Sequence, residues 1–363
     1  MHFPESIFSE LKVVELASVL AGPAVGRFFS ELGATVTKIE NARTGGDVTR
    51  RWKLPGEETP PDLSAYYCSV NWRKTSLLLD LHDAADRQRV FELIAEADIL
   101  IGNFRATAAR KLGLHYEQLR EAYPRLIYGW ITGYGMEDTR PAFDVVLQAE
   151  TGFLHMTGEP GRPPVKMPVA LIDLLAAHQL KEGILTALWQ RERNGKGNLI
   201  HVSLYDAAIA SLANQATNYL MADYVPQPRG TQHPNIAPYG DLVYSVEGKP
   251  LVLAVGTEAH FVGLCTALDI ADLAREARFA TNAQRVIHRQ ELLDRLRKIT
   301  VQRTVKELTQ LLDEHDVPFG EINDLATVFT NPSARRLVAT EELKNGAMAK
   351  SVRTTVFEWM PTE

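Results

Sequence analysis

The chain of 363 residues is 45% hydrophobic and 23% charged, a composition typical of globular proteins, and its length predicts two domains. A net charge of −6 with no long basic run argues against a nucleic-acid partner, and the lack of any run of about 18 apolar residues argues against a membrane span. The N-terminal segment lacks the pattern of a signal peptide, and the two cysteines, Cys68 and Cys265, lie far apart in the sequence, so we expect a reducing compartment, the cytoplasm.

Residues 11–40 predict a strand, a helix and a second strand. The apolar run 12–16 is typical of a short strand, and residues 21–23 predict a turn whose proline opens the helix. Apolar residues at helical spacing then predict a helix over 24–32, which Gly33 ends as a C-terminal cap. The segment 35–39 follows as the second strand. This βαβ unit indicates the first half of a nucleotide-binding α/β domain.

The unit lacks the motif by which such domains bind a dinucleotide. Gly22 and Gly26 do not form the G-x-G-x-x-G pattern that lets the backbone approach a pyrophosphate. Glu40 stands where a ribose-binding acid is expected, but without the glycines this match is weak. The sequence therefore disfavours NAD or FAD, and any phosphate here must be bound in another way.

The first half of the chain continues to alternate between strand and helix patterns. Such alternation is typical of a mostly parallel sheet covered by helices on both faces. We therefore expect a Rossmann-like α/β large domain over residues 1–222. The further strands expected are 76–81, 98–104, 125–132 and 199–204, and the helices are 84–97, 107–112, 116–122, 174–193 and 206–222.

The pattern of the sequence changes after residue 222. Residues 223–240 are rich in proline and polar residues and predict a linker. Residues 241–328 predict a small α+β domain that begins with a hairpin, and residues 329–363 show little periodicity. The hairpin strands are 242–246 and 251–255, and the helices lie around 258–268, 288–298 and 304–314.

Asp173 is the candidate catalytic residue. It lies in the otherwise apolar run PVALIDLLAAHQL, where a buried charge is costly unless it is paired or has a function. A structural role is also open, because an aspartate directly before a helix is a frequent N-cap. The two roles are compatible at the start of a helix.

Eight segments occur in an order that matches a known family. They are VLAGPAVGRFFSELGATVTKIE (19–40), GGDVTRRW (45–52), WRKTSLLLDL (72–81), ADILIGNFRATAARKLGL (97–114), GWITGYG (129–135), AFDVVLQAETG (142–152), HVSLYDAAIA (201–210) and HPNIAPYG (233–240). Together they resemble the class III coenzyme A transferases, the CaiB/BaiF family of formyl-CoA transferase and carnitine CoA-transferase, to which α-methylacyl-CoA racemase is related. The resemblance implies transfer of CoA from an acyl-CoA to a carboxylic acid. It also implies an interlocked homodimer in which residues 329–363 return to the large domain.

The resemblance places the nucleophilic aspartate of these enzymes at Asp173. That carboxylate would form an anhydride with the acyl group and then a thioester with CoA, so that covalent catalysis divides one difficult step into easier ones. Each step passes through an oxyanion, which needs N–H donors nearby, and the segment 133–135 is a candidate wall for it. A turn after a strand is the alternative interpretation of that glycine-rich segment.

The resemblance also implies a CoA site. Basic side chains in the matched motifs would meet the CoA phosphates, and a lysine at position 111 replaces the usual arginine of the family, losing bidentate phosphate binding. Leu20 stands where formyl-CoA transferase has a glutamine near the thioester, and Asn41 where it has a CoA-binding arginine, for which Arg43 is a possible substitute. For each basic residue alone, a solvated surface charge is the alternative. The expected CoA-binding residues are Leu20, Ala21, Asn41, Arg43, Lys74, Asn103, Phe104, Arg105, Lys111, Thr132 and Tyr134.

Two departures from the family narrow the function. Phe143 stands where the racemases have a histidine, and a phenyl ring cannot exchange a proton, which favours transfer over racemisation. Residues 229–233 contain one glycine where formyl-CoA transferase has a run of them, which disfavours oxalate and formyl-CoA as the pair. We expect CoA thioester as substrate, no permanently bound cofactor and no metal. The alternatives are a 2-methylacyl-CoA racemase and a non-catalytic CoA-binding scaffold.

Overall fold

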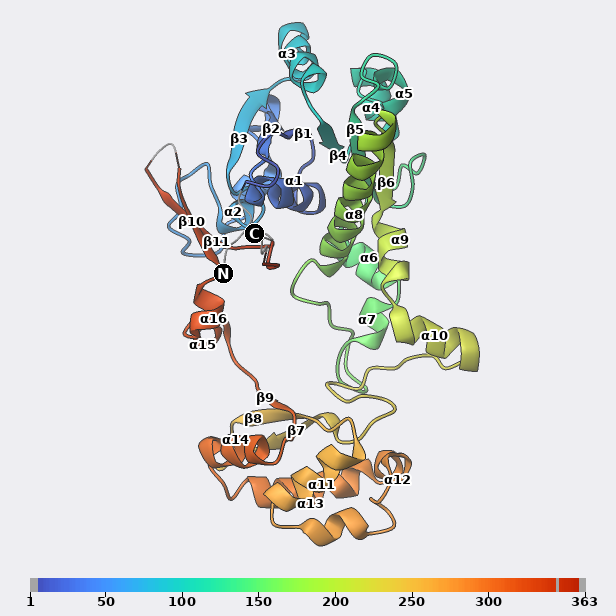
Figure 1. Cartoon of the computed structure of the whole chain (residues 1–363), viewed down its shortest axis with the longest axis vertical. Helices are drawn as coiled ribbons and strands as arrows, with labels where there is room; N and C mark the ends of the chain where they lie inside the picture. The colour runs from blue at the N-terminus through green and yellow to red at the C-terminus, as the bar shows by residue number, and fades with distance from the viewer. Residues whose placement is uncertain (1–5, 344–345, 359–363) are drawn as a thin grey trace. The chain divides into compact units, whose positions relative to one another are not determined.

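The computed structural model describes residues 6–343 and 346–358, and the chain forms two compact units (Figure 1). The first unit comprises Met1–Leu154, Lys166–Val225 and Ser333–Glu363, and the second comprises His155–Val165 and Pro226–Pro332. The second unit thus takes in residues 155–165, which the sequence analysis places in the large domain. The proline and glycine residues of that segment predict a loop but do not indicate which unit it joins.

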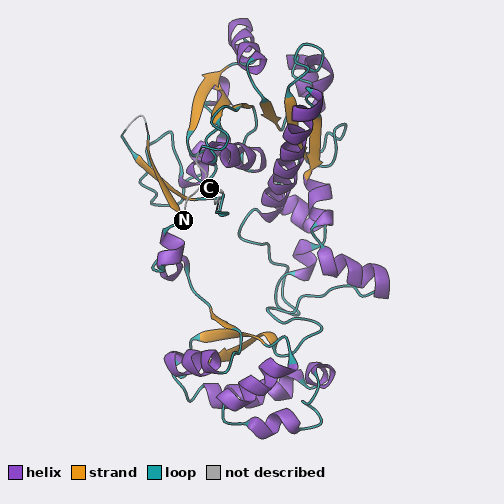
Figure 2. Cartoon of the chain, in the orientation of Figure 1, coloured by secondary structure: helices purple, strands orange, loops and turns teal. Residues whose placement is uncertain are grey.

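A six-stranded parallel sheet forms the centre of the first unit (Figure 2). Its order, β3-β2-β1-β4-β5-β6, is the doubly wound order of Rossmann-like folds and confirms the predicted fold class. The chain runs outward from β1 to β3 and then returns to the other side of β1 with β4. The strands are β1 (Lys12–Glu15), β2 (Thr35–Asn41), β3 (Lys74–Leu79), β4 (Ile99–Gly102), β5 (Ile127–Thr132) and β6 (Leu199–Ser203).

Helices cover both faces of this sheet, and alternate residues of each strand pack toward opposite faces. In β4, Ile99 and Ile101 pack with α1 and α8, whereas Leu100 packs with α3, α4 and α5. This burial on both sides explains why the strands are continuously apolar. The helices are α1 (Ala21–Glu31), α8 (Leu171–Asn194) and α9 (Leu204–Ala210) on one face, and α3 (Ala84–Ala95), α4 (Ala106–Leu112) and α5 (Tyr116–Leu119) on the other.

Two predicted helix boundaries are wrong. Residues 21–23 do not form a turn, because α1 already begins at Ala21, and Pro23 lies within its first turn, where a missing N–H costs no hydrogen bond. The helix expected over 206–222 is divided into α9 and α10 (Ala213–Ala222), and the first residue of α10, Ala213, has a φ of 47°. Gly33 has a φ of 98° just beyond α1, as its predicted capping role requires.

Several short elements in the first unit or at its boundary were not predicted from the sequence. They lie in segments too short for a periodic pattern to be counted. They are the 3₁₀ turns Ala42–Thr44 and Val48–Arg51 and the helices α2 (Ala65–Cys68), α6 (Asp144–Glu150) and α7 (Phe153–Met156).

The C-terminal segment packs on α1. Within it, β10 (Val338–Glu342) and β11 (Met348–Val352) form an antiparallel hairpin that the weak periodicity did not predict. Arg27 and Glu31 of α1 form a buried ion pair of 2.7 Å. The Arg27 guanidinium donates to the carbonyl of Val352, and the Glu31 carboxylate accepts the N–H groups of residues 354 and 355.

The second unit is a small α+β structure with its own core. The predicted hairpin is present, and a third antiparallel strand pairs with it. The strands are β7 (Tyr239–Tyr244), β8 (Pro250–Ala254) and β9 (Phe319–Glu321), and the helices are α11 (Glu258–Ala267), α12 (Asn282–Ile287), α13 (Arg289–Thr300), α14 (Val305–Glu314), α15 (Leu325–Val328) and, at the boundary with the first unit, α16 (Pro332–Arg335).

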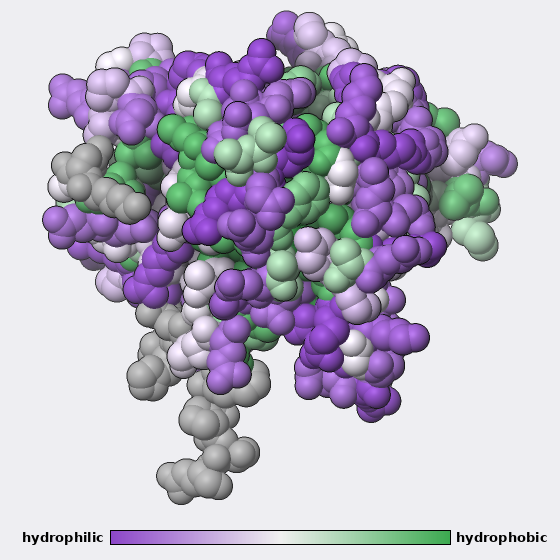
Figure 3. All heavy atoms as spheres, turned by 90° about the horizontal axis from the view of Figure 1, so that it is seen from above, coloured by the Kyte–Doolittle hydropathy of each residue, from purple (hydrophilic) through white to green (hydrophobic). Residues whose placement is uncertain are grey.

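The surface shown in Figure 3 is mostly hydrophilic, with hydrophobic residues showing between the polar ones. Across the described residues, no helix is both long enough and apolar enough to cross a membrane.

Gly26 lets α1 approach β1 closely, and a substitution at this position tests that packing. A Cβ at this position would lie 1.8 Å from Glu15 Oε2 and 3.3 Å from Lys74 Nζ, two groups that are paired and cannot move freely. Alanine normally stabilises a helix interior relative to glycine by about 1 kcal/mol. We expect Gly26→Ala instead to lower the free energy of unfolding by about 1–3 kcal/mol, measured by urea denaturation. The control is Gly256→Ala, whose Cβ would have an ordinary contact of 3.9 Å. A stabilised Gly26→Ala would contradict this packing.

Candidate active site

A cavity opens at the carboxyl ends of β1, β4 and β5, where the strand order reverses direction. Residues 18–21 follow β1, residues 103–105 follow β4, and residues 132–133 end β5. Asp173 joins them from the first turn of α8. Doubly wound folds bind their ligands at this edge and at this switch in strand order.

A second cavity adjoins the first, since Ser18 and Phe104 line both. It lies at the carboxyl ends of β1, β2 and β3 and includes residues 38–41 and 79–82. An extended ligand bound along this edge would reach from the second cavity to Asp173. The two cavities therefore suit a long molecule with a reactive end.

Asp173 is buried, with 8% of its surface exposed. Burial raises the pKa of its carboxyl to about 7, and the nearby negative charge of Asp144 adds to the shift. Within the described part of the chain, no hydrogen bond to this carboxyl is found. A carboxyl that is buried, unpaired and close to half ionised at neutral pH is typical of a catalytic group.

The N-cap interpretation of Asp173 is wrong, and Asp144 explains why. Helix α8 begins at Leu171, so Asp173 is its third residue, and the N-cap position holds Ala170, which has no capping side chain. Asp144 accepts the Ile172 N–H at 2.7 Å and the side-chain amide of Gln148 at 2.5 Å. Because Asp144, the first residue of α6, caps α8, the carboxyl of Asp173 is left to face the cavity.

The structure brings most of the predicted site residues together. Asn41 lines the adjoining cavity, and Phe104 lines both. The predicted residues that line the first cavity are Leu20, Ala21, Asn103, Phe104, Arg105, Thr132 and Asp173.

Lys74 does not fit its predicted role as a phosphate ligand. Its ammonium group is buried beneath α1, 2.7 Å from Glu15 Oε2, and it also donates to the Pro23 carbonyl and the Asn71 amide oxygen. These three acceptors use its three donors. The sequence does not reveal this burial, because it depends on the packing of α1. Lys74 is therefore not a phosphate ligand but a buried partner of Glu15.

Three other predicted residues lie outside the described lining of both cavities. Arg43 is exposed with its Nε 4.0 Å from Asp80, which does line the second cavity. Lys111 is exposed on α4. Tyr134 packs partly against the core and lies under the guanidinium of Arg140 at 3.6 Å. Of the predicted segment 133–135, Gly133 lines the cavity, and a Cβ there would lie 2.3 Å from that of Ala142.

Sequence reasoning missed an ion pair in the cavity. Arg140 and Asp138 both line it, and they pair at 2.8 Å. They lie between the matched segments GWITGYG and AFDVVLQAETG. Their place between two site segments was the one sequence feature that could have indicated a position near the cavity. Phe143, which distinguishes the chain from the racemases, lies on the same wall and is 55% exposed.

The sequence also gave no sign of the backbone conformation at the cavity. Val19 has a φ of 72°, the left-handed region that a β-branched residue rarely adopts. Such a conformation costs about 1–3 kcal/mol and persists only where the surroundings impose it.

The doubly wound fold and the buried carboxyl at its switch point thus define an enzyme-like α/β domain with a site for an extended ligand. Comparison with known protein families identifies the family: the sequence matches CoA-transferase family III over residues 8–363. The chain belongs to this family of enzymes, as its motifs indicated.

Named relatives agree with this assignment. The chain is 38% identical to the succinate–glutarate CoA-transferase of Agrobacterium fabrum, over 96% of this chain and 88% of that protein. It is 32% identical to the human succinyl-CoA:glutarate CoA-transferase, over 94% and 77%. It is also 32% identical to the acetyl-CoA:oxalate CoA-transferase of Acetobacter aceti, over 91% and 84%.

Solved structures share the fold along nearly the whole chain. A CaiB/BaiF family protein from Brucella suis matches with a TM-score of 0.83 and 37% identity, over 98% of this chain and 93% of that one. Rv3272 from M. tuberculosis matches with a TM-score of 0.84 and 28% identity, over 98% and 94%.

The raised pKa of Asp173 predicts that the wild type and a variant without this carboxyl differ in stability by an amount that depends on pH. The folded protein holds the Asp173 proton up to about pH 7, whereas the unfolded chain releases it near pH 4, so this residue destabilises the fold increasingly between those values. We expect Asp173→Asn to be more stable than the wild type by about 2–4 kcal/mol at pH 8, with a difference that shrinks toward pH 5. Urea denaturation at both pH values measures this.

The control for this experiment is Asp62→Asn, which neutralises an exposed aspartate of the same unit. Equal free energies of unfolding for the Asp173→Asn variant and the wild type at pH 8 would show that the environment of the carboxyl does not destabilise its ionised form.

Proposed function

We propose that the enzyme transfers CoA from a small acyl-CoA to a free carboxylic acid, with Asp173 as the covalent carrier. The Asp173 carboxylate attacks the thioester carbonyl, forming an acyl–aspartyl anhydride and releasing CoA thiolate. The thiolate attacks the aspartyl carbonyl, giving an aspartyl-CoA thioester and the donor acid. The acceptor carboxylate then attacks that thioester, and the released thiolate takes the new acyl group and frees Asp173.

The position of Asp173 is the observation that carries this proposal. Its carboxyl is unpaired and lies in a cavity at the ligand-binding edge of the sheet. With a pKa of about 7, a substantial fraction is ionised at neutral pH, and little water is present to solvate the charge. Such a carboxylate is ready to act as a nucleophile.

The start of α1 supports the oxyanion chemistry of these steps. Leu20 and Ala21 line the same cavity, and the first N–H groups of a helix have no acceptor within it. We propose that these N–H groups, with that of Gly133, stabilise the oxyanions formed during acyl transfer.

The adjoining cavities support a CoA site. We propose that Arg105 binds a phosphate of CoA and that Asn41 and Phe104 line the nucleotide region, with Arg43 and Lys111 reaching the phosphates from the rim. The relatives named above act between CoA thioesters and acids such as succinate, glutarate and oxalate. We propose a short acid as acceptor here too. Phe143 in the cavity wall disfavours the racemase alternative, because it cannot exchange a proton.

We further propose that the enzyme is a homodimer, as the family resemblance implies. The exposed apolar side chains on α10 support this, with Leu220 at 77% and Met221 at 81% exposure. A cytoplasmic location stays a prediction based on the two cysteines, both of which are free.

Hydroxylamine trapping tests the carrier. We expect incubation with acyl-CoA and hydroxylamine to leave a hydroxamate on Asp173, because both its anhydride and its thioester react with this nucleophile. Asp173→Ala should abolish transfer, and Asp173→Glu should reduce it about 100-fold, because the carboxylate moves by about 1 Å. Peptide mass spectrometry and a transfer assay provide the measurements.

Asp144 supplies an internal control, since its carboxylate is occupied by Ile172 and Gln148 and should stay unmodified. An active preparation in which Asp173 stays unmodified would count heavily against the mechanism.

Arg105→Gln tests the CoA site. We expect it to raise the KM for acyl-CoA about 10- to 100-fold with a smaller change in kcat, because a charge-assisted hydrogen bond to a phosphate is lost. Arg110→Gln is the matched control, five residues further along, exposed and paired with Glu137 away from the cavity lining. Steady-state kinetics with both variants measures the effect, and equal KM values for the two would refute the assignment.

A further inference from the structure

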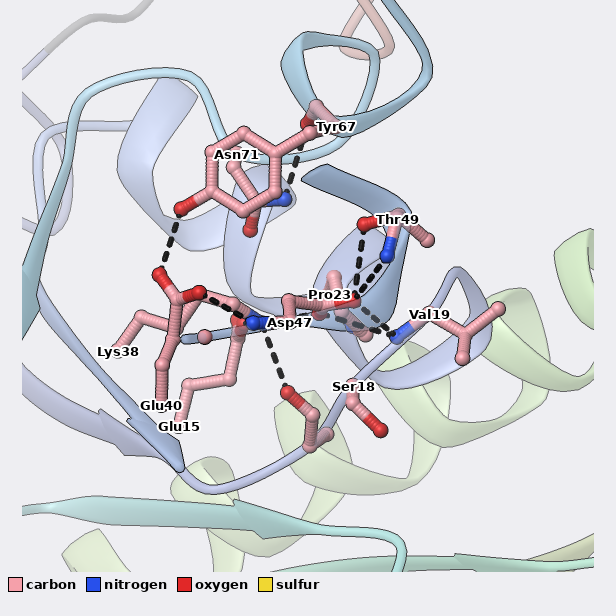
Figure 4. Close-up of polar contacts among 12 residues, drawn as sticks. Glu15, Ser18, Val19, Pro23, Lys38, Glu40, Asp47, Thr49, Tyr67 and Asn71 are labelled. Atoms are coloured by element: carbon pink, nitrogen blue, oxygen red, sulfur yellow. Dashed lines mark hydrogen bonds and ion pairs between the residues drawn. The ribbon is translucent and has the colours of Figure 1, made fainter. Parts of the chain in front are cut away.

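The turn between β1 and α1 is held in place by side chains from other strands and loops. Its residues 18–21 line the cavity that contains Asp173. Val19, in its left-handed conformation, donates its N–H to the carboxylate of Asp47, at 3.1 Å to Oδ2. Figure 4 shows this contact and the residues around it.

Two neighbouring residues of the turn are held as well. The Lys38 ammonium donates to the Ala17 carbonyl at 2.8 Å. The Asn103 side chain accepts the Ser18 N–H at 3.2 Å and donates to the Ser18 carbonyl at 3.0 Å. Of these contacts, the one from Asp47 is made to the residue whose conformation is unfavourable.

Asp47 is itself fixed and buried. Its carboxylate lies 3.2 Å from Lys38 Nζ and accepts both the N–H and the hydroxyl of Thr49, at 3.0 and 2.8 Å. Its own N–H donates to Glu40 at 2.7 Å. With 4% of its surface exposed, Asp47 does not contact solvent freely, and it has no freedom to turn away from Val19.

The charge of Asp47 belongs to a buried cluster, defined here as Glu15, Lys38, Asp47 and Lys74. Lys38 lies between the two acids, 2.9 Å from Glu15 and 3.2 Å from Asp47, and Lys74 pairs with Glu15. Burial lowers the pKa of Lys74 to about 7, so Lys38 is the main cation of the cluster and it faces two carboxylates. The Asp47 carboxylate is thus a charge partner of Lys38 as well as the acceptor of the Val19 N–H.

We propose that Asp47 is a positioning residue for acyl transfer: its carboxylate holds Val19 in the left-handed conformation and thereby sets the direction of the N–H groups at the start of α1. This inference rests on the proposed function, in which those N–H groups stabilise the oxyanions. Asp47 lines the adjoining cavity but not the one that contains Asp173, so its effect on the chemistry at Asp173 is exerted through the turn.

Asp47→Asn tests the proposal. The amide keeps one acceptor oxygen but loses the ion pair to Lys38, so the turn becomes free to shift. We expect the rate of Asp173 acylation per folded enzyme, measured at saturating acyl-CoA, to fall about 10- to 100-fold. Rapid-quench mass spectrometry of the covalently modified enzyme in a single turnover, normalised to folded protein by circular dichroism and gel filtration, measures that rate.

A second substitution separates positioning from general destabilisation. Val19→Gly removes the steric penalty of the left-handed conformation, so the turn depends less on Asp47. We expect the loss caused by Asp47→Asn to be several-fold smaller in the Val19→Gly background than in the wild type. Equal losses in the two backgrounds would overturn the proposal.

Tyr67→Phe is the matched control. It removes a 2.8 Å hydrogen bond to the buried carboxylate of Glu40, beside the cluster but without contact to the turn. We expect a stability loss with an unchanged acylation rate; a loss equal to that of Asp47→Asn would show that any damage near the cluster slows the enzyme.

If Asp47→Asn does not fold, Thr49→Val replaces it as the test. Thr49→Val removes only the hydroxyl that orients the Asp47 carboxylate, and we expect it to slow acylation by a few-fold. An unchanged rate would then count against the proposal. If the wild type itself forms no hydroxamate at Asp173, the proposed function fails, whereas failure of the Asp47 inference leaves the wild-type hydroxamate intact.

Discussion

The site depends on a division of roles between two aspartates at the start of α8. Asp144 caps the helix by accepting the Ile172 N–H. The carboxyl of Asp173, the residue after Ile172, is therefore left without a partner. An unpaired buried carboxyl is destabilising, and its raised pKa is the measure of that cost. The fold therefore maintains a group that is unfavourable for stability but suited to covalent chemistry, the trade-off common at active sites.

The rest of the first unit presents the ligand to this group. Reversal of the strand order between β1 and β4 opens the edge of the sheet, and the loops after β1, β4 and β5 form the cavity walls. Buried charges beneath the β1–α1 turn fix one wall of the Asp173 cavity, and two of them, Lys38 and Asp47, also line the adjoining cavity. Gly26 allows this arrangement, since a side chain there would collide with Glu15. The chain thus uses small residues and internal ion pairs where dinucleotide-binding domains of similar architecture use a glycine-rich loop.

The sequence predicted what depends on local pattern and missed what depends on packing. The parallel sheet, α1 and the small α+β unit follow from periodicity. Seven predicted site residues meet in one cavity, six of them at the carboxyl ends of neighbouring strands and Asp173 at the start of α8. Lys74 was misassigned because its burial under α1 leaves no trace in the sequence. The capping of α8 by Asp144 joins residues 28 positions apart, and the left-handed Val19 has a residue type that usually avoids that conformation.

Oxygen exchange at Asp173 tests the covalent mechanism most directly. When an acceptor acid labelled with oxygen-18 attacks the aspartyl thioester, its oxygen bridges the new anhydride and stays on Asp173 as the product acyl-CoA leaves. Tryptic cleavage after Lys166 and Lys181 would give a peptide in which Asp173 is the only acidic side chain. We predict that this peptide gains oxygen-18 during turnover. An unlabelled peptide from enzyme that has completed many turnovers would contradict the account.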